Sequence, residues 1–200
     1  MILALAPHTD DVTRSAGGLV AKSASLGERI VLLAFSVGNP DSGSHAAEFA
    51  DAAQILGVAG TQVFDYETHH FCEHRQRILT TIEAQIAIYR PDLLVIPARH
   101  DHQDHQVIHN EAIRAARRTN IKIIAYEQAW DQTLCPFRST MYASLPFAAL
   151  ATKLRAVAAF ESQKGRDYMD PNRIIASALH HGATIGEQFA EAFEVLRWTM

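Results

Sequence analysis

The sequence is poor in cysteine and has no long hydrophobic run. Cys72 and Cys135 are its only cysteines, too few and too isolated for a disulfide framework or a cysteine-based zinc site, so we expect unpaired thiols. No apolar stretch reaches the about 20 residues that a membrane span requires. The opening segment MILALAPHTDD lacks the basic start of a signal peptide and resembles a buried strand. These absences predict a cytoplasmic protein without a membrane span.

The sequence also lacks a cluster of positive charge. Its formal net charge is -4, and the 18 Lys and Arg residues are scattered, which argues against binding to nucleic acid or to an anionic membrane. With 200 residues, 48% of them hydrophobic, we expect a single domain over 1–200. A domain of this size buries about 70% of its unfolded surface, so it needs no structural metal. Any metal is then expected to be catalytic.

Short apolar runs alternate with longer segments of helical period, which indicates βαβ units. The expected strands are 2–6, 30–35, 61–64, 92–97 and 121–126, with an edge strand at 139–144. The expected helices are 19–26, continuing from Gly17-Gly18, and 44–56, 73–89, 107–118, 146–162 and 171–181, with a loop at 39–44. The sequence thus predicts an α/β fold with a Rossmann-like, mostly parallel sheet flanked by helices and with a helical C-terminal region.

Histidine is abundant, with 11 residues, and two polar clusters follow predicted strands. The first is Pro7–Asp11, after the first strand, and the second is His100–His105, after the strand that ends at Pro97. Open α/β sheets bind ligands beyond the carboxyl ends of their strands. Right-handed crossovers bring both segments to the same edge of the sheet. We therefore expect the two clusters to converge.

The converging residue types are those of a catalytic zinc site. Such a site uses three ligands from His, Asp and Glu and leaves a position for water, and His8, Asp11 and His105 supply this set. Zn²⁺ is the expected metal, with Fe²⁺ also possible because imidazole and carboxylate accept both. Hydrolysis needs a base in addition, and Asp10, adjacent to a ligand, is the candidate.

His102 and Asp104 are the remaining candidates for catalysis. His102 precedes His105 by three residues, and the carboxylate of Asp104 is close enough in sequence to fix its tautomer or keep it protonated. His102 is then suited to stabilising an oxyanion or protonating a leaving amine.

Simpler interpretations exist for each cluster taken alone. An Asp-Asp pair after a strand is often a helix N-cap with a first-turn acid, and a His-rich loop is often a solvated turn. The two clusters together, at matching strand ends, favour a metal site. A third group, His69, His70 and His74, has no acid at ligand spacing, so we interpret it as surface or cleft lining.

The motifs resemble the PIG-L/LmbE-like N-acetylglucosamine deacetylases, in the bacterial branch associated with polysaccharide or natural-product sugars. The motif residues are Pro7–Asp11 with Gly17-Gly18, His102–His105 and Tyr126-Glu127, and the similarity continues through Glu48, Ala52, Leu56-Gly57, Lys153, Ser162-Gln163, Gly186 and Ala190–Phe193. The resemblance implies a Rossmann-like fold and zinc-dependent hydrolysis of an acetamido group on a small-molecule sugar or sugar conjugate.

By motif position, the resemblance implies that His8, Asp11 and His105 are the metal ligands. It likewise implies that Asp10 is the general base and His102 the second catalytic residue. The sequence departs from the family pattern at Val12, where Glu is common, and at His45, where Arg is common.

Other functions remain open. A His/Asp metal site also suits another single-metal amidase or a phosphoesterase, and a catalytically inactive sugar-binding homologue is a further alternative. The sequence assigns no role to His45, and we expect structural or cleft-rim roles for Lys153, Ser162, Gln163 and Glu191. The apolar residues near the end pack either on the protein's own core, as we expect, or on a second copy in a homo-oligomer. They are Phe189, Phe193, Leu196 and Trp198.

Overall fold

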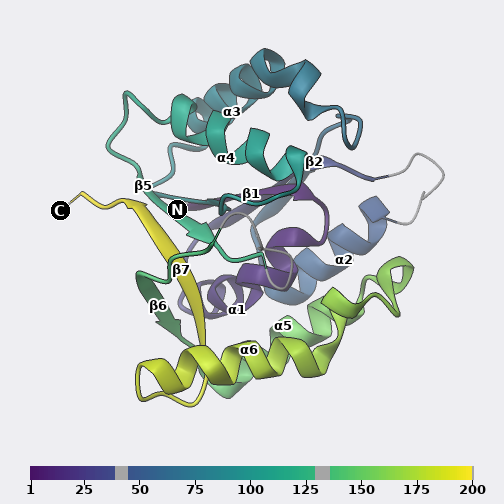
Figure 1. The fold of residues 1–200 in the computed structure, drawn as a ribbon, viewed down its shortest axis with the longest axis vertical. Helices are drawn as coiled ribbons and strands as arrows, with labels where there is room; N and C mark the ends of the chain where they lie inside the picture. The colour runs from purple at the N-terminus through teal and green to yellow at the C-terminus, as the bar shows by residue number, and fades with distance from the viewer. Residues whose placement is uncertain (39–44, 129–135, 200) are drawn as a thin grey trace.

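A seven-stranded sheet organises the chain. The computed structural model describes residues 1–38, 45–128 and 136–199. The strands lie in the order β3-β2-β1-β4-β5-β7-β6 (Figure 1). Strands β3, β2, β1, β4 and β5 are parallel, whereas β7 runs antiparallel to its neighbours β5 and β6. The mostly parallel α/β fold is therefore as predicted, while the loop at 39–44 and Cys135 lie outside the described residues.

The strands are β1 (Ile2–His8), β2 (Ile30–Ser36), β3 (Gly60–Val63), β4 (Leu93–Pro97), β5 (Lys122–Tyr126), β6 (Met141–Ser144) and β7 (Ala190–Arg197). The helices are α1 (Asp11–Ser25), α2 (His45–Leu56), α3 (Arg75–Tyr89), α4 (Gln103–Ala115), α5 (Phe147–Ala158) and α6 (Pro171–Thr184). Short 3₁₀ helices span Phe71–His74, Glu161–Gln163 and Asp167–Met169.

Helices cover both faces of the sheet. Helices α3 and α4 lie on one face, and α1, α2, α5 and α6 lie on the other (Figure 1). The side chains of β1 alternate to match, since Leu3 and Leu5 join the core under α3 and α4 while Ala4 and Ala6 join the core under α1. Because both faces are covered, the central strands are continuous apolar runs without polar alternation.

The chain reverses its direction of travel across the sheet at β1. It moves outward from β1 to β2 and β3, and then returns to the other side of β1 with β4. Such a reversal is the switch point outside which open α/β sheets bind ligands. His8 ends β1 and the His100–His105 segment follows β4. The structure thus confirms that the two polar clusters open at one edge of the sheet.

Several helix boundaries differ from the predicted ones. Helix α1 already begins at Asp11, with Asp10 as its N-cap residue, and α4 begins at Gln103 instead of 107, with His102 as its N-cap residue. Asp11 and His105 therefore lie in the first turns of helices, not in loops. Helix α5 ends at Ala158, before the expected end at 162, because the chain turns into a 3₁₀ helix.

The last strand, β7, was not predicted. The segment 190–197 inserts between β5 and the edge strand β6, which lies within the expected range 139–144. Phe189 and Phe193 are buried in the protein's own core, as expected, whereas Trp198 is 51% exposed. Oligomeric state stays a prediction.

No helix in the described part of the chain is long and apolar enough to cross a membrane. Cys72 is a free, exposed cysteine. The cytoplasmic location stays a prediction.

Candidate functional site

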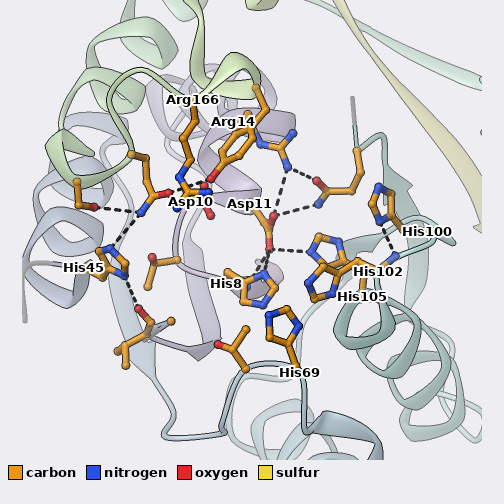
Figure 2. Close-up of a pocket in the computed structure, with 18 residues that line it drawn as sticks. His8, Asp10, Asp11, Arg14, His45, His69, His100, His102, His105 and Arg166 are labelled. Atoms are coloured by element: carbon orange, nitrogen blue, oxygen red, sulfur yellow. Dashed lines mark hydrogen bonds and ion pairs between the residues drawn. The ribbon is translucent and has the colours of Figure 1, made fainter. Parts of the chain in front are cut away.

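A cavity of about 590 Å³ opens at the switch point, beyond the carboxyl ends of β1 and β4 (Figure 2). Its lining includes residues from the first two-thirds of the chain that we call the floor: His8, Asp10, Asp11, His102 and His105. A second group comes from the segment between α5 and α6, and we call it the C-terminal wall: Ser162, Gln163, Arg166 and Tyr168. All the sequence-predicted site residues except Asp104 line the cavity.

His8, Asp11 and His105 converge as candidate metal ligands. Asp11 Oδ2 lies 3.4 Å from His8 Nδ1 and 3.4 Å from His105 Nε2, and the three groups each present a ligand atom within 4.8 Å of the others. A tetrahedral zinc ion with bonds of about 2.0–2.1 Å holds neighbouring ligand atoms about 3.3–3.4 Å apart. The donor types and their spacing therefore fit a single tetrahedral ion.

The electrostatics of these residues favour a bound cation. Burial opposes protonation of His8, but the carboxylates of Asp104, Asp11 and Asp10 outweigh it and raise the pKa of His8 to about 10. Burial lowers the pKa of His105 to about 3, although Asp11 acts in the opposite direction. Neutral imidazole is the form that binds metal. The same carboxylates that raise the pKa of His8 would stabilise a bound metal ion.

Asp11 is ionised and held in place from several sides. Burial would raise its pKa, but His105, His8 and Arg14 lower the pKa well below its ordinary value. Asp11 Oδ2 accepts a hydrogen bond of 2.8 Å from the backbone N–H of His8. These contacts fix the carboxylate at the end of β1.

Asp10 is buried in the floor, and its side chain does not cap α1. It is the N-cap residue of that helix, yet its side chain makes no capping hydrogen bond, so the simpler N-cap interpretation does not describe it. Burial raises its pKa, and the neighbouring charge of Asp11 raises it further. A carboxylate with a raised pKa next to the candidate ligands is suited to accepting a proton.

The expected pairing of Asp104 with the ring of His102 is wrong. Asp104 Oδ2 lies 3.2 Å from His8 Nε2 and accepts a 2.8 Å hydrogen bond from the backbone N–H of His69. The ring of His102 instead accepts a 3.1 Å hydrogen bond at Nδ1 from the backbone N–H of Asp104. The reason is the early start of α4, which makes His102 its N-cap residue and turns the Asp104 side chain towards β1.

This geometry sets the state of His102. Because Nδ1 accepts a hydrogen bond, the ring carries its proton on Nε2. Burial lowers the pKa of His102, and the nearby positive charge of His8 lowers it further, against the opposing effect of Asp104. His102 is therefore a neutral hydrogen-bond donor. With His8 and Asp104 it forms a second group of possible ligands, but the shared His8 leaves one ion as the simplest occupancy.

Sequence reasoning missed two residues that contact Asp11. Arg14 Nη2 lies 3.3 Å from Asp11 Oδ1, and Gln128 Nε2 donates to the same oxygen over 3.4 Å. Arg14 and Gln128 also contact each other. The helical spacing from Asp11 to Arg14 would have indicated the first contact once the helix start was known. Gln128 follows the carboxyl end of β5, so the strand-end rule would have indicated the second.

The C-terminal wall is linked to His45 by hydrogen bonds. His45 Nδ1 donates to Val37 O over 2.6 Å, and its Nε2 accepts from Gln163 Nε2 over 3.0 Å. The hydroxyl of Tyr168 donates to Gln163 Oε1 over 2.9 Å. His45 thus holds Gln163 in the C-terminal wall.

Two tyrosines and two histidines of the third group differ in whether they reach the cavity. Tyr126 is fully buried and donates to Leu5 O over 2.9 Å, so it does not reach the cavity, whereas Tyr168 lines it. His69 lines the cavity as well, which agrees with the expected cleft lining. His70 lies outside the lining and pairs with Glu73 at 2.8 Å.

Lys153 and Glu191 form a buried ion pair away from the floor. Lys153 Nζ lies 2.7 Å from Glu191 Oε1, and the carboxylate also accepts from the backbone N–H groups of Gly18 and Leu19 at 2.8 and 2.7 Å. The pair joins α5 and β7 to α1. Gly18 leaves room for this contact, since a Cβ there would lie 2.8 Å from Glu191 Oε1. The geometry supports a structural role.

Fold and site together define an open α/β protein with a candidate single-metal centre at its switch point. The sequence matches the family model described as PIG-L, GlcNAc-PI de-N-acetylase, over residues 3–116, and the chain belongs to this family. A search of curated proteins gave no match.

Solved structures with the same fold were also found. A conserved protein from Thermus thermophilus is 20% identical, with a TM-score of 0.81 over 100% of this chain and 96% of that one. The 4-carboxy-2-hydroxymuconate hydratase from Pseudomonas putida is 16% identical, with a TM-score of 0.85 over 100% and 97%. N,N'-diacetylchitobiose deacetylase from Pyrococcus horikoshii is 18% identical, with a TM-score of 0.76 over 98% and 83%. At these identities the likeness establishes the fold.

Proposed function

We propose that the protein is a zinc-dependent N-deacetylase that hydrolyses the acetamido group of an N-acetylated amino sugar or sugar conjugate, releasing acetate and a free amine. The observation that carries the proposal is the triangle of His8, Asp11 and His105, with 3.4 Å edges from Asp11 to each histidine, on the floor of a cavity that also holds Asp10. Zn²⁺ is the proposed metal, and the same ligands accept Fe²⁺.

The comparisons support this reaction. The family description names a de-N-acetylase, and the fold neighbours include a chitobiose deacetylase, an A40926 pseudoaglycone deacetylase and a teicoplanin deacetylase. One structure of a teicoplanin deacetylase is a zinc-inhibited form, so zinc acts on that protein. These three neighbours are named as deacetylases, which favours hydrolysis of an acetyl group over the phosphoesterase alternative.

A divalent ion held by the three ligands would supply a water of lowered pKa and polarise a carbonyl oxygen. Asp10 is the proposed base, because its raised pKa strengthens its affinity for a proton and it lines the same cavity. It would accept a proton from the attacking water and return that proton to the departing nitrogen. One carboxylate thereby serves as base and then as acid.

His102 is the proposed oxyanion donor. Because Nδ1 accepts from the backbone N–H of Asp104, Nε2–H is the donor of the ring. As the acetamide carbon becomes tetrahedral, negative charge grows on its oxygen, and a fixed N–H donor stabilises that charge. The neutral state of His102 favours this role over protonation of the amine.

Asp104 is proposed to orient His8. A histidine ligand usually donates its second ring N–H to a carboxylate or carbonyl, which fixes the tautomer and the direction of the coordinating nitrogen. Asp104 Oδ2 lies 3.2 Å from His8 Nε2, while His8 Nδ1 faces Asp11. On this proposal, Asp104 contributes to catalysis through His8.

A hydratase reaction is the competing function that the fold neighbours raise, because one of them is a hydratase. Hydration also needs an activated water and a base, so the floor alone does not separate the two reactions. The inactive sugar-binding alternative is disfavoured because every candidate residue is present and converges.

The decisive experiment measures acetate release from a panel of N-acetylated sugars by zinc-loaded protein, metal-depleted protein and the Asp10→Asn variant. We expect release by the loaded protein, none after chelation, and a loss of about 10²–10⁴ in rate for Asp10→Asn with metal content unchanged. Hydration of an unsaturated carboxylic acid without any acetate release would replace this proposal with the hydratase.

A further inference from the structure

His69 lines the cavity in a backbone conformation that residues with a side chain rarely adopt. Its φ is 70°, in the left-handed region, where a Cβ atom is crowded by the neighbouring carbonyl. Among the described residues, Arg90 is the other non-glycine residue with a positive φ, and it is the C-cap residue of α3, outside the lining of the cavity. Glycine would adopt the φ of His69 without strain. A strained side chain beside candidate catalytic groups indicates a function for that side chain.

Two hydrogen bonds hold the main chain of His69 in this conformation. Its N–H donates to Asp104 Oδ2 over 2.8 Å, and its carbonyl oxygen accepts from the side-chain amide of Gln103. Both partners lie in the first turn of α4, directly after its N-cap residue His102. Because both bonds use main-chain atoms of His69, they remain available when another residue replaces it. The loop is thus joined to the start of α4 independently of the His69 ring.

The ring of His69 stacks on the ring of His102. The two ring centres lie 5.2 Å apart and the planes are 26° from parallel, a separation at which aromatic rings attract one another. Figure 2 shows the His69 ring rising from its loop towards His102. The rings of His8 and His105 also contact His102, each at 5.1 Å, but at steeper angles of 74° and 50°. His69 is therefore the stacked neighbour of the proposed oxyanion donor.

The hydrogen bond of His102 does not by itself fix the plane of its ring. The ring is anchored at Nδ1, which accepts from the backbone N–H of Asp104 over 3.1 Å. The torsion about the Cβ–Cγ bond of an imidazole has broad minima, so a ring held at Nδ1 can still tilt and move Nε2. His102 is only half-buried, and a flat ring stacked on its face opposes that tilt.

We propose that His69 is a positioning residue, whose ring stacks on His102 and directs the Nε2–H of His102 at the acetamide oxygen. This deepens the proposed function and rests on it. A preorganised donor stabilises the developing charge when it points at the position that the oxygen takes in the transition state. The chain thus places a ring where glycine would suit the backbone better but would leave His102 without its stacking partner.

The test separates the side chain of His69 from its backbone. His69→Gly relieves the strain, keeps both main-chain bonds and removes the ring, and His69→Asn also tolerates the left-handed conformation without supplying a ring. His69→Phe restores a flat ring. The matched control is Arg90→Gly, which relieves strain at an exposed position outside the cavity. For each zinc-loaded variant, we would measure kcat and KM for acetate release, zinc content and the midpoint of denaturant unfolding.

We expect kcat of His69→Gly and His69→Asn to fall about tenfold, less than the about 10²–10³ lost with an oxyanion donor itself. KM and zinc content should stay at the parent values. His69→Gly should unfold at the same or a higher denaturant concentration than the parent, because glycine adopts this φ freely. His69→Phe should keep more of the parent kcat than His69→Gly, and Arg90→Gly should keep all of it. A His69→Gly variant with the parent kcat overturns the proposal.

A double-mutant cycle tests whether His69 acts through His102. In the His102→Ala background the donor is already lost, so His69→Gly should change kcat by less than about twofold. A tenfold loss that persists in this background overturns the positioning role, because His69 then acts on the substrate or on the fold directly.

A readout without turnover distinguishes the two proposals. NMR relaxation of the Cε1–H bond of His102, assigned by the signal missing in His102→Ala, reports how restricted the ring is. Its order parameter should fall in His69→Gly and stay at the parent value in Arg90→Gly. If it falls but no sugar releases acetate, the contact that orients His102 stands and the deacetylase falls. If acetate is released and His69→Gly changes neither the order parameter nor kcat, the deacetylase stands and the role of His69 falls.

Discussion

The cavity is built from two parts of the chain that contribute different chemistry. The floor comes from the ends of β1 and β4, within the segment 3–116 that matches the family model, whereas the C-terminal wall lies at 162–168, outside that segment. The floor is dense in ionisable groups with strongly shifted pKa values, such as His8 and His105. The wall offers an amide, hydroxyls and a guanidinium.

The difference indicates a division of labour. Adjacent parallel strands of a rigid sheet hold the floor, which suits a metal and proton transfer because both need fixed geometry. The wall is carried by turns and short 3₁₀ helices between α5 and α6, where a change of sequence does not disturb the sheet. We therefore expect mutations in the two parts to give different phenotypes.

The largest effect is expected for His105→Ala in the floor. Removal of a ligand should abolish stoichiometric zinc after loading and dialysis, together with acetate release, while circular dichroism keeps its shape. The matched control is His109→Ala on the same helix, since His109 is also buried but donates to Pro97 O over 2.8 Å. A His105→Ala variant that retains one zinc per chain would show that the ligand assignment is wrong.

His102→Ala should have the next largest effect. Loss of one oxyanion donor lowers kcat by about 10²–10³, and zinc content should stay at the parent value because His102 is outside the ligand triangle. Measurement of kcat together with analysis of the metal content would test this. Near-normal turnover would pass the role to Tyr168, the tyrosine that lines the cavity, and Tyr168→Phe would be measured next.

Asp104→Asn should act on metal affinity before it acts on chemistry. The carboxylate orients His8, and loss of such a partner typically lowers metal affinity by about 10–100-fold. Competition with a chelator gives the affinity, and excess zinc should restore much of the acetate release. Unchanged affinity combined with slow turnover at saturating zinc would show that Asp104 does not act by orienting His8.

Glu191→Gln should leave the chemistry unchanged and lower stability. The side chains of Lys153 and Glu191 are 6% and 5% exposed, and breaking a buried pair costs about 3–5 kcal/mol because one charge stays uncompensated. Denaturant unfolding should show this loss, with kcat of the folded protein at the parent value. Glu194→Gln, on the same strand, is the control. A Glu191→Gln variant that binds zinc and melts normally but does not turn over would place the C-terminal region in the catalytic set.

Local sequence patterns were sufficient to predict most of the residues that form the floor. The strands over 2–6 and 92–97 could be predicted because a strand buried on both faces is an uninterrupted apolar run. A polar cluster follows each of them at once. Parallel connections then require the two clusters to share one edge, and this rule alone predicts that His8, Asp11 and His105 converge. The helix starts were harder to predict, because Asp11 and Gln103 begin helices inside segments whose sequence resembles a polar turn.

Only the tertiary structure decided which side chains contact one another in the floor and which residues form the C-terminal wall. Asp104 contacts His8 and not the ring of His102 because the N-cap of α4 sets its direction. Residues 190–197 became a strand between β5 and β6 because long-range pairing there buries Ala190–Phe193. The sequence by itself determined the α/β class, the two converging clusters and the candidate ligands, since these follow from local periodicity and strand order. Side-chain direction and the contacts of 162–168 with the first part of the chain depend on residues more than a hundred positions apart, as in the hydrogen bond from Gln163 to His45. No local pattern encodes them.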